Sequence, residues 1–143
     1  MLLSTELTAM VKSKKTAKDI QVWVEDKILP SLGQNIAIEV VVQTLFYLGS
    51  KSFTHMVTVL ERYGQILNKL ASDQNLQVFL IQEVSKVWQN SAQMTAIAID
   101  RMMGYRIISN LAIVYWVFSP ENAEKFHIAD YIWEVMYFFY ILF

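Results

Sequence analysis

The two histidines, His55 and His127, are the side chains of this chain best suited to acid–base or metal chemistry. Neither has a partner at a metal-ligand spacing such as His-Glu-x-x-His. The chain also has no cysteine, which excludes thiolate zinc sites, thiol catalysis and disulfide frameworks together. We therefore expect each histidine to stand near a helix start with a hydrogen-bonded ring. We predict no catalytic, cofactor-binding or metal-binding residue.

Two pairs of adjacent opposite charges, Glu61-Arg62 and Asp100-Arg101, are the next candidates for acid–base chemistry. Adjacent residues do not face each other on a helix, so neither pair forms a site by itself. A catalytic carboxylate pair would also need a cleft, which the spacing does not supply. We expect these residues to form salt bridges between neighbouring helices or to contact a partner.

The basic cluster of the chain consists of Lys12, Lys14, Lys15 and Lys18. Three of these lysines lie at the end of the first predicted helix, where positive charge is favourable, or in the turn after it. A solvated turn is therefore our main interpretation, and a localisation signal or a phosphate-contacting patch is the alternative. The whole chain has 12 basic and 13 acidic residues, a net charge of −1. This balance disfavours direct, nonspecific RNA binding.

The four tryptophans, Trp23, Trp88, Trp116 and Trp133, raise the question of base stacking. Aromatic platforms for nucleic acid usually stand beside basic residues, which are scarce near these positions. Trp88 continues the apolar stripe of its predicted helix. We therefore expect the tryptophans to serve the core and helix–helix packing.

Size and composition fit one domain with a real core. The chain has 143 residues, of which 55% are hydrophobic and 17% charged, and its mean hydropathy is +0.32. The N-terminal residues lack the basic start and apolar core of a signal peptide. The longest uncharged stretch, residues 107–120, is shorter than the roughly 20 residues that a membrane span needs. We therefore expect no membrane-spanning helix.

The elements that must position these side chains are helices, because apolar residues recur at steps of three and four and strand-like alternation is nearly absent. Seven or eight helices joined by short turns are expected. The fold class is all-α, an antiparallel helix-hairpin stack of the α-solenoid, HEAT-like kind. Helix starts are expected at Ser4 or Thr5, at Thr16 with a capping box to Asp19, and at four later positions. Those four are Ser52, Ser72 or Asp73, Ser109, and Ser119 before Pro120.

Helix ends are expected at three residues that disfavour helix continuation. Pro30 should end the second helix. Gly49 should follow the third helix, residues 34–48, as a C′ glycine, and Gly104 should end the sixth. One apolar stripe of the fourth helix should include Phe53, and one of the seventh should include Leu111 and Phe118.

The last eight residues, 136–143, are all apolar or aromatic and carry no charge. Exposed, they would be an aggregation hazard, and they are too short to span a bilayer. We divide the chain into a helical-repeat domain, residues 1–135, and this atypical tail. Our hypothesis is that the tail is intron read-through or a mis-called exon end. Transcript reads across the codons of residues 135–137 test it.

Four uncommon segments occur in order along the chain. They are Gly49-Ser-Lys-Ser-Phe-Thr-His55, Leu60-Glu-Arg-Tyr-Gly-Gln65, Ala98-Ile-Asp-Arg-Met-Met-Gly-Tyr-Arg106 and Trp116-Val-Phe-Ser-Pro-Glu-Asn122. Their order and spacing resemble the large-subunit family of the nuclear cap-binding complex, in its plant form. The resemblance runs from about residue 3 to about residue 135. It is with part of the third helical domain, which itself resembles the middle domain of eukaryotic initiation factor 4 gamma.

The resemblance implies a fragment of a non-enzymatic scaffold. In that family the large subunit holds a small subunit with an RNA recognition motif, and the small subunit stacks the 7-methylguanosine cap between its own aromatics. Capped RNA would then be an indirect partner, and the missing helical domains would be neighbours. The implied setting is the nucleus, with shuttling to the cytoplasm. The implied processes are mRNA processing, splicing, export, nonsense-mediated decay and small-RNA pathways.

Partner contacts are expected at Arg101, Tyr105 and Arg106, because Arg and Tyr are favoured at interface centres and these three cluster at one helix end. The alternative is that they brace neighbouring helices. Two other functions stay open. One is a generic α-solenoid adaptor for proteins, and the other is a membrane-associated helical protein, which rests on the tail and the hydropathy. Removal of residues 136–143 tests the latter.

Overall fold

The computed structural model describes residues 2–123, and these form eight α-helices without a strand. The predicted all-α class is therefore confirmed for this part of the chain. The helices are α1 (Leu2–Lys12), α2 (Ala17–Lys27), α3 (Leu29–Leu48), α4 (Phe53–Leu70), α5 (Gln74–Val87), α6 (Ala92–Gly104), α7 (Asn110–Val117) and α8 (Pro120–Ala123).

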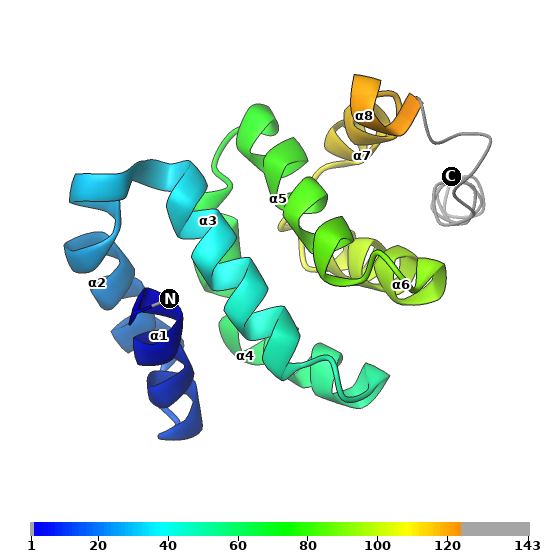
Figure 1. The fold of residues 1–143 in the computed structure, drawn as a ribbon. Coiled ribbons are helices and arrows are strands. Elements are labelled where there is room, and N and C mark those ends of the chain that lie inside the picture. The colour runs from blue at the N-terminus through cyan, green and yellow to red at the C-terminus, as the bar shows by residue number, and fades with distance from the viewer. Residues whose placement is uncertain (1, 124–143) are drawn as a thin grey trace.

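The helices pack in two layers, as in an α-solenoid. One layer is made by α1, α3, α5 and α7, in which each helix packs on the next odd-numbered one. The second layer is made by α2, α4 and α6 in the same manner. Figure 1 shows the odd-numbered helices side by side in chain order, with α4 behind α3. Successive helices therefore form hairpins that stack, which confirms the predicted architecture.

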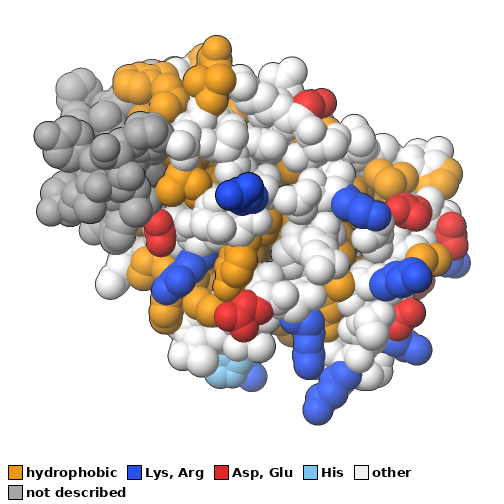
Figure 2. Space-filling view, turned by 180° about the vertical axis from the view of Figure 1, so that it is seen from behind, with side chains coloured by type: hydrophobic (Ala, Val, Ile, Leu, Met, Phe, Trp, Pro, Cys, Tyr) orange, Lys and Arg blue, Asp and Glu red, His pale blue; other side chains and the backbone are white. Residues whose placement is uncertain are grey.

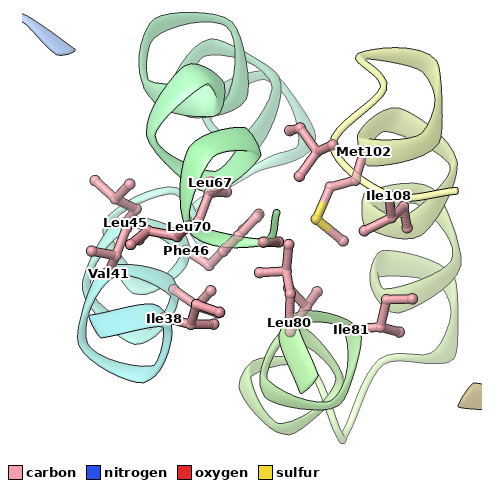
Figure 3. Packing of buried hydrophobic residues seen from close by; sticks show 14 of the residues in the cluster. Ile38, Val41, Leu45, Phe46, Leu67, Leu70, Leu80, Ile81, Met102 and Ile108 are labelled. Carbon is pink, nitrogen blue, oxygen red and sulfur yellow. The ribbon is translucent and has the colours of Figure 1, made fainter. Parts of the chain in front are cut away.

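The core lies between these two layers and extends through the described part of the chain. Helix α3 contributes a dense set of buried residues, including Ile38, Val41 and Phe46, which point toward α4 and α5 (Figure 3). The Phe46 ring meets Trp88 edge to face at 5.1 Å between centroids. Because β-branched residues fill α3 yet it remains a helix, burial outweighs their weak strand preference.

Trp116 and Trp23 also serve the core and helix–helix packing, as predicted. Trp116 is fully buried, and its indole Nε1–H donates to Gln82 Oε1 at 3.1 Å. Trp23 packs against the core and donates to Glu6 Oε2 at 2.9 Å. Each indole thus keeps a polar partner while its rings leave water.

Polar caps begin four helices where the sequence predicts them, whereas the Ser119 hydroxyl before α8 has no hydrogen-bond partner among the described residues. The Thr16 hydroxyl accepts from the Asp19 amide, and the Asp19 carboxylate accepts from the Thr16 amide, which completes the capping box of α2. Ser52, Asp73 and Ser109 cap α4, α5 and α7. Ser91 caps α6. One expectation fails, because α1 already begins at Leu2 rather than after Ser4 or Thr5.

The boundary between α2 and α3 and the role of Gly49 differ from expectation, although α3 ends at Leu48 as predicted. Pro30 lies in the first turn of α3 rather than ending α2, because a missing amide hydrogen costs nothing at a helix start. Just after it, Gly33 has φ 84° and kinks α3 before the long helical run that the sequence predicts. Gly49 has φ −85°, so it is not a left-handed cap. The structure favours glycine at position 49 because a Cβ there would come within 3.2 Å of Met56 Cα.

Some predicted apolar stripes are only partly buried. Phe53, Leu111 and Phe118 are exposed, although Met56 and Ile113 beside them are buried. A helix on the outer side of a two-layer stack buries only the face toward its neighbours, which explains the difference. Three features of the sequence analysis lie outside the described residues: His127, Trp133 and the tail 136–143. No helix within residues 2–123 has the length and apolarity to cross a bilayer.

Candidate partner-binding site

The turn between α6 and α7 brings the three predicted contact residues to one edge of the molecule. Helix α6 ends in a Schellman motif, in which the Arg106 amide donates to Met103 O at 3.0 Å and the Ile107 amide to Met102 O at 2.8 Å. Arg106 has φ 60°, the left-handed conformation that this motif requires. The predicted end of the helix at Gly104 is confirmed, because Gly104 is the last residue of α6, although Arg106 rather than a glycine takes the left-handed position.

Each of the three predicted residues also contacts α4. The Tyr105 hydroxyl lies 3.4 Å from Glu61 Oε1, to which it donates. The Arg101 guanidinium lies 5.4 Å from the centre of the Phe53 ring. The Arg106 carbonyl accepts from Asn68 Nδ2 at 2.9 Å. The turn is therefore braced against α4, while the side chains of all three residues remain exposed.

A hollow of about 420 Å³ lies between α4 and this turn. Its apolar floor is made by Leu60, Gly64 and Ile107. Its walls are polar: Glu61, Gln65, Asn68, Lys69 and Tyr105. Gly64 brings α4 close to the turn, because a Cβ there would stand 3.3 Å from Ile107 Cδ1. This close approach shapes the floor of the hollow.

The electrostatics of the hollow centre on Tyr105, which is 40% exposed. Partial desolvation, then the Glu61 carboxylate, raises the pKa of the Tyr105 phenol, and Arg101 lowers it by a smaller amount. The phenol therefore stays neutral at ordinary pH and can donate to Glu61. Glu61 and Arg101 thus make interhelical contacts, through a hydroxyl and a ring rather than through the salt bridges that we expected.

The turn between α1 and α2 repeats this backbone motif with a different surface. The Lys14 amide donates to Val11 O and the Lys15 amide to Met10 O, both at 3.0 Å, and Lys14 has φ 61°. The Tyr63 hydroxyl of α4 donates to Lys15 O at 3.2 Å. All four lysines of the basic cluster are exposed. Their exposure agrees with the solvated-turn interpretation of Lys12, Lys14, Lys15 and Lys18 and equally with a localisation signal or a phosphate-contacting patch, so both stay predictions.

The histidine that the structure describes has the expected structural role. His55 stands in the first turn of α4, and its ring Nδ1 is 2.7 Å from the Ser52 hydroxyl. Within residues 2–123 no three His, Asp or Glu side chains gather into a potential metal site.

Sequence reasoning missed the α4 side of the hollow. Glu61 was noted only as part of a charged pair, and Asn68 and Lys69 were not noted at all. Asn68 and Arg106 are 38 positions apart, and Glu61 and Tyr105 are 44 apart. The available signal was the polar face of α4, where Glu61, Gln65 and Asn68 follow each other at helical spacing.

Comparison with known proteins identifies the family. The MIF4G-like family matches residues 3–138. Over 134 residues the chain is 58% identical to nuclear cap-binding protein subunit 1 of Arabidopsis thaliana and 59% identical to that of Oryza sativa. It is 31% identical over 146 residues to the Xenopus tropicalis protein of the same name.

Each of these alignments covers 94% of this chain, but only 16% of either plant protein and 18% of the frog protein. The chain thus spans about a sixth of the length of the plant relatives. Identity to the plant proteins is nearly twice that to the frog protein, which confirms the resemblance to the plant form. With its stacked helical hairpins, the chain belongs to the MIF4G-like family.

Proposed function

We propose that this chain is a scaffold segment of the nuclear mRNA cap-binding complex and has no enzymatic activity. The observation that carries the proposal is 58% identity over 94% of the chain to a plant nuclear cap-binding protein subunit 1. The fold agrees with it, because stacked helical hairpins present long surfaces on which other proteins dock. The name of these relatives describes nuclear proteins, and we propose that this chain also acts in the nucleus.

In the proposed function the chain supports a small subunit with an RNA recognition motif. The small subunit binds the 7-methylguanosine cap, so this chain meets capped RNA only through its partner. Its own near-neutral charge agrees with that indirect role. The complex would then act in mRNA processing, splicing, export, decay and small-RNA pathways, with shuttling to the cytoplasm.

The proposed contact residues are Arg101, Tyr105 and Arg106. The turn is held against α4 by the Arg106 carbonyl and the Tyr105 hydroxyl, while the three side chains remain exposed. A preorganised backbone with free side-chain surface lowers the entropic cost of association. The division at about residue 135 belongs to the same proposal, with residues 1–135 as the scaffold segment and residues 136–143 as a separate apolar tail.

Retention on 7-methylguanosine beads tests the proposed function. The chain is mixed with the small cap-binding subunit and applied to the beads, with free cap analogue as competitor. The proposal predicts retention only when the small subunit is present, and release by the competitor. Passage through the beads with the small subunit bound there would contradict a scaffold role for this segment.

The alternative is a generic α-solenoid adaptor that binds unrelated proteins. The two-layer helical stack favours it to the same degree, because the fold does not specify the partner. An adaptor would fail to bind the small subunit and would bind another protein or peptide. The same beads, with the small subunit present, therefore separate the two functions.

A further inference from the structure

We propose that the turn between α1 and α2 is a docking surface for a short acidic segment of a protein partner. Its lysine patch is made by four exposed side chains: Lys12, Lys14, Lys15 and Lys18. This partner goes beyond the proposed scaffold function, because it is a second one that meets the chain at a surface other than the α6–α7 turn. The concentration of charge, the fixed backbone beneath it and the surroundings of the patch support the proposal.

Positive charge is concentrated at this turn. Residues 12–18 hold four of the 12 basic residues of the chain and none of its 13 acidic residues, so the rest of the chain is net acidic. Within residues 2–123, none of the four lysines forms a salt bridge with a carboxylate. Like charges this close together repel one another, and an acidic partner relieves that repulsion while it gains attraction to each of them.

The backbone below the patch is fixed, so the lysines are presented from a folded turn. Lys14 has φ 61° in the Schellman motif, and the Tyr63 hydroxyl holds the Lys15 carbonyl at 3.2 Å. The capping box of Thr16 and Asp19 then starts α2. An extended localisation signal would have to release these contacts, whereas docking on the folded turn keeps them. A fixed turn also lowers the entropic cost of association.

The charges next to the patch do not cancel it. Asp19 is the carboxylate nearest in sequence, and it accepts the Thr16 amide at the positive end of α2. Glu6 on α1 accepts an indole N–H. On the α4 side the exposed Arg62 adds a positive charge, because its guanidinium lies 6.0 Å from the centre of the Tyr63 ring, whose hydroxyl reaches the turn. Figure 2 shows Lys and Arg side chains projecting at the lower right, on the side of α1 and α2, with acidic side chains above them.

Two observations favour a protein segment over RNA. Single strands of nucleic acid usually bind where exposed aromatic rings stand beside basic residues. The one aromatic residue of α1 and α2 is Trp23, which is half-buried against the core and offers no such platform. A long phosphate chain would also run past the patch over a chain that is otherwise net acidic, whereas a short acidic segment ends with the patch.

Fluorescence anisotropy with the full chain tests the proposal. The probe is a short labelled peptide of consecutive glutamates. The same peptide with glutamine in place of glutamate is the first control, and single-stranded oligouridine is the second. We expect saturable binding of the glutamate peptide, weakened by salt, with chemical-shift changes at the amides of residues 14–18, and weaker binding of both controls. Equal or tighter binding of either control, or no binding of the glutamate peptide, would overturn the proposal.

Two double variants with the same change in net charge locate the site. Lys15→Gln with Lys18→Gln removes two charges from the patch, and Lys27→Gln with Lys51→Gln removes two exposed charges elsewhere. All four side chains are exposed, so neither variant is expected to unfold the chain, which circular dichroism checks. We expect the first variant to raise the Kd for the glutamate peptide about three- to tenfold, as for two exposed ion pairs, and the second to leave it nearly unchanged. Equal effects would mean that net charge alone explains binding, and would overturn the proposal.

The outcome is independent of the bead experiment. The peptide measurement uses neither the small subunit nor the cap, so the peptide can bind even if the cap-bead test fails. Conversely, retention on cap beads with no peptide binding would overturn the docking surface at the α1–α2 turn and leave the scaffold function standing.

Discussion

The α1–α2 turn and the α6–α7 turn have the same backbone design but different surroundings. Both end a helix with a Schellman motif, both place a basic residue at positive φ, and both receive a side-chain hydrogen bond from α4. The residue after the left-handed position differs. It is Ile107, which is 2% exposed, in one turn and the exposed Lys15 in the other. One turn is therefore anchored in the core, and the other stands in solvent.

The comparison shows that the same local backbone geometry does not decide whether a turn is anchored in the core. In a Schellman motif the residue after the left-handed position often packs on the preceding helix. Ile107 is buried in the same core cluster as Met102, and its amide donates to Met102 O, so it holds Tyr105 and Arg106 beside the polar face of α4. Lys15 is charged and exposed, so its turn carries charge at the surface and lacks an anchor in the core.

The largest expected effect on stability comes from Ile107, the residue that anchors the α6–α7 turn in the core. Ile107→Ala removes a buried side chain from the α6–α7 turn and should lower the free energy of unfolding by about 2–5 kcal/mol. Lys15→Ala, at the equivalent position of the other turn, should leave it unchanged. Urea denaturation followed by circular dichroism measures both. Equal effects would show that the two turns are held in the same way.

Loss of either hydrogen bond from α4 to a turn should lower the free energy of unfolding less than Ile107→Ala does. Tyr63→Phe removes the donor to Lys15 O, and Asn68→Ala removes the donor to Arg106 O. Each should destabilise the chain by about 0.5–1.5 kcal/mol. The same urea titrations report the values. A loss confined to Asn68→Ala would mean that the α1–α2 turn does not depend on its bond to Tyr63.

Relief of the backbone strain should act in the opposite direction. Arg106→Gly and Lys14→Gly should each raise the free energy of unfolding by about 0.5–1 kcal/mol, because glycine adopts positive φ freely and part of that gain is offset by its larger unfolded-state entropy. Thermal unfolding measures the gain. A loss of stability in Arg106→Gly would mean that the arginine side chain itself braces the fold.

The smallest expected effect is a pH dependence found only at the α6–α7 turn. Desolvation and Glu61 raise the pKa of Tyr105 above its unfolded value of 10.0. Above pH 10 the unfolded phenol ionises first, so the contribution of Tyr105 to stability is lost as the pH rises through the raised pKa. Tyr105→Phe should reduce the fall in stability between pH 9 and pH 11. An unchanged slope would show that Tyr105 feels no such environment.

The fold was largely predictable from sequence, because its signals are local. Caps such as Thr16, Ser52 and Asp73 and the apolar periodicity are read within a few residues. The end of α6 at Gly104 was predicted too, but the left-handed residue was not, because glycine is the usual residue in that conformation and the chain uses Arg106 two positions later. The hollow could be predicted only on its α6 side. Its α4 side depends on packing between residues about 40 positions apart, which periodicity does not encode.

Hydrogen exchange of the chain, alone and with the small cap-binding subunit, tests most directly whether the α6–α7 turn is the partner-facing region. The account predicts slower exchange at the amides of residues 104–109 in the presence of the subunit, and no change at residues 12–17. Protection of residues 12–17 with none at residues 104–109 would contradict it, and so would unchanged exchange at both turns.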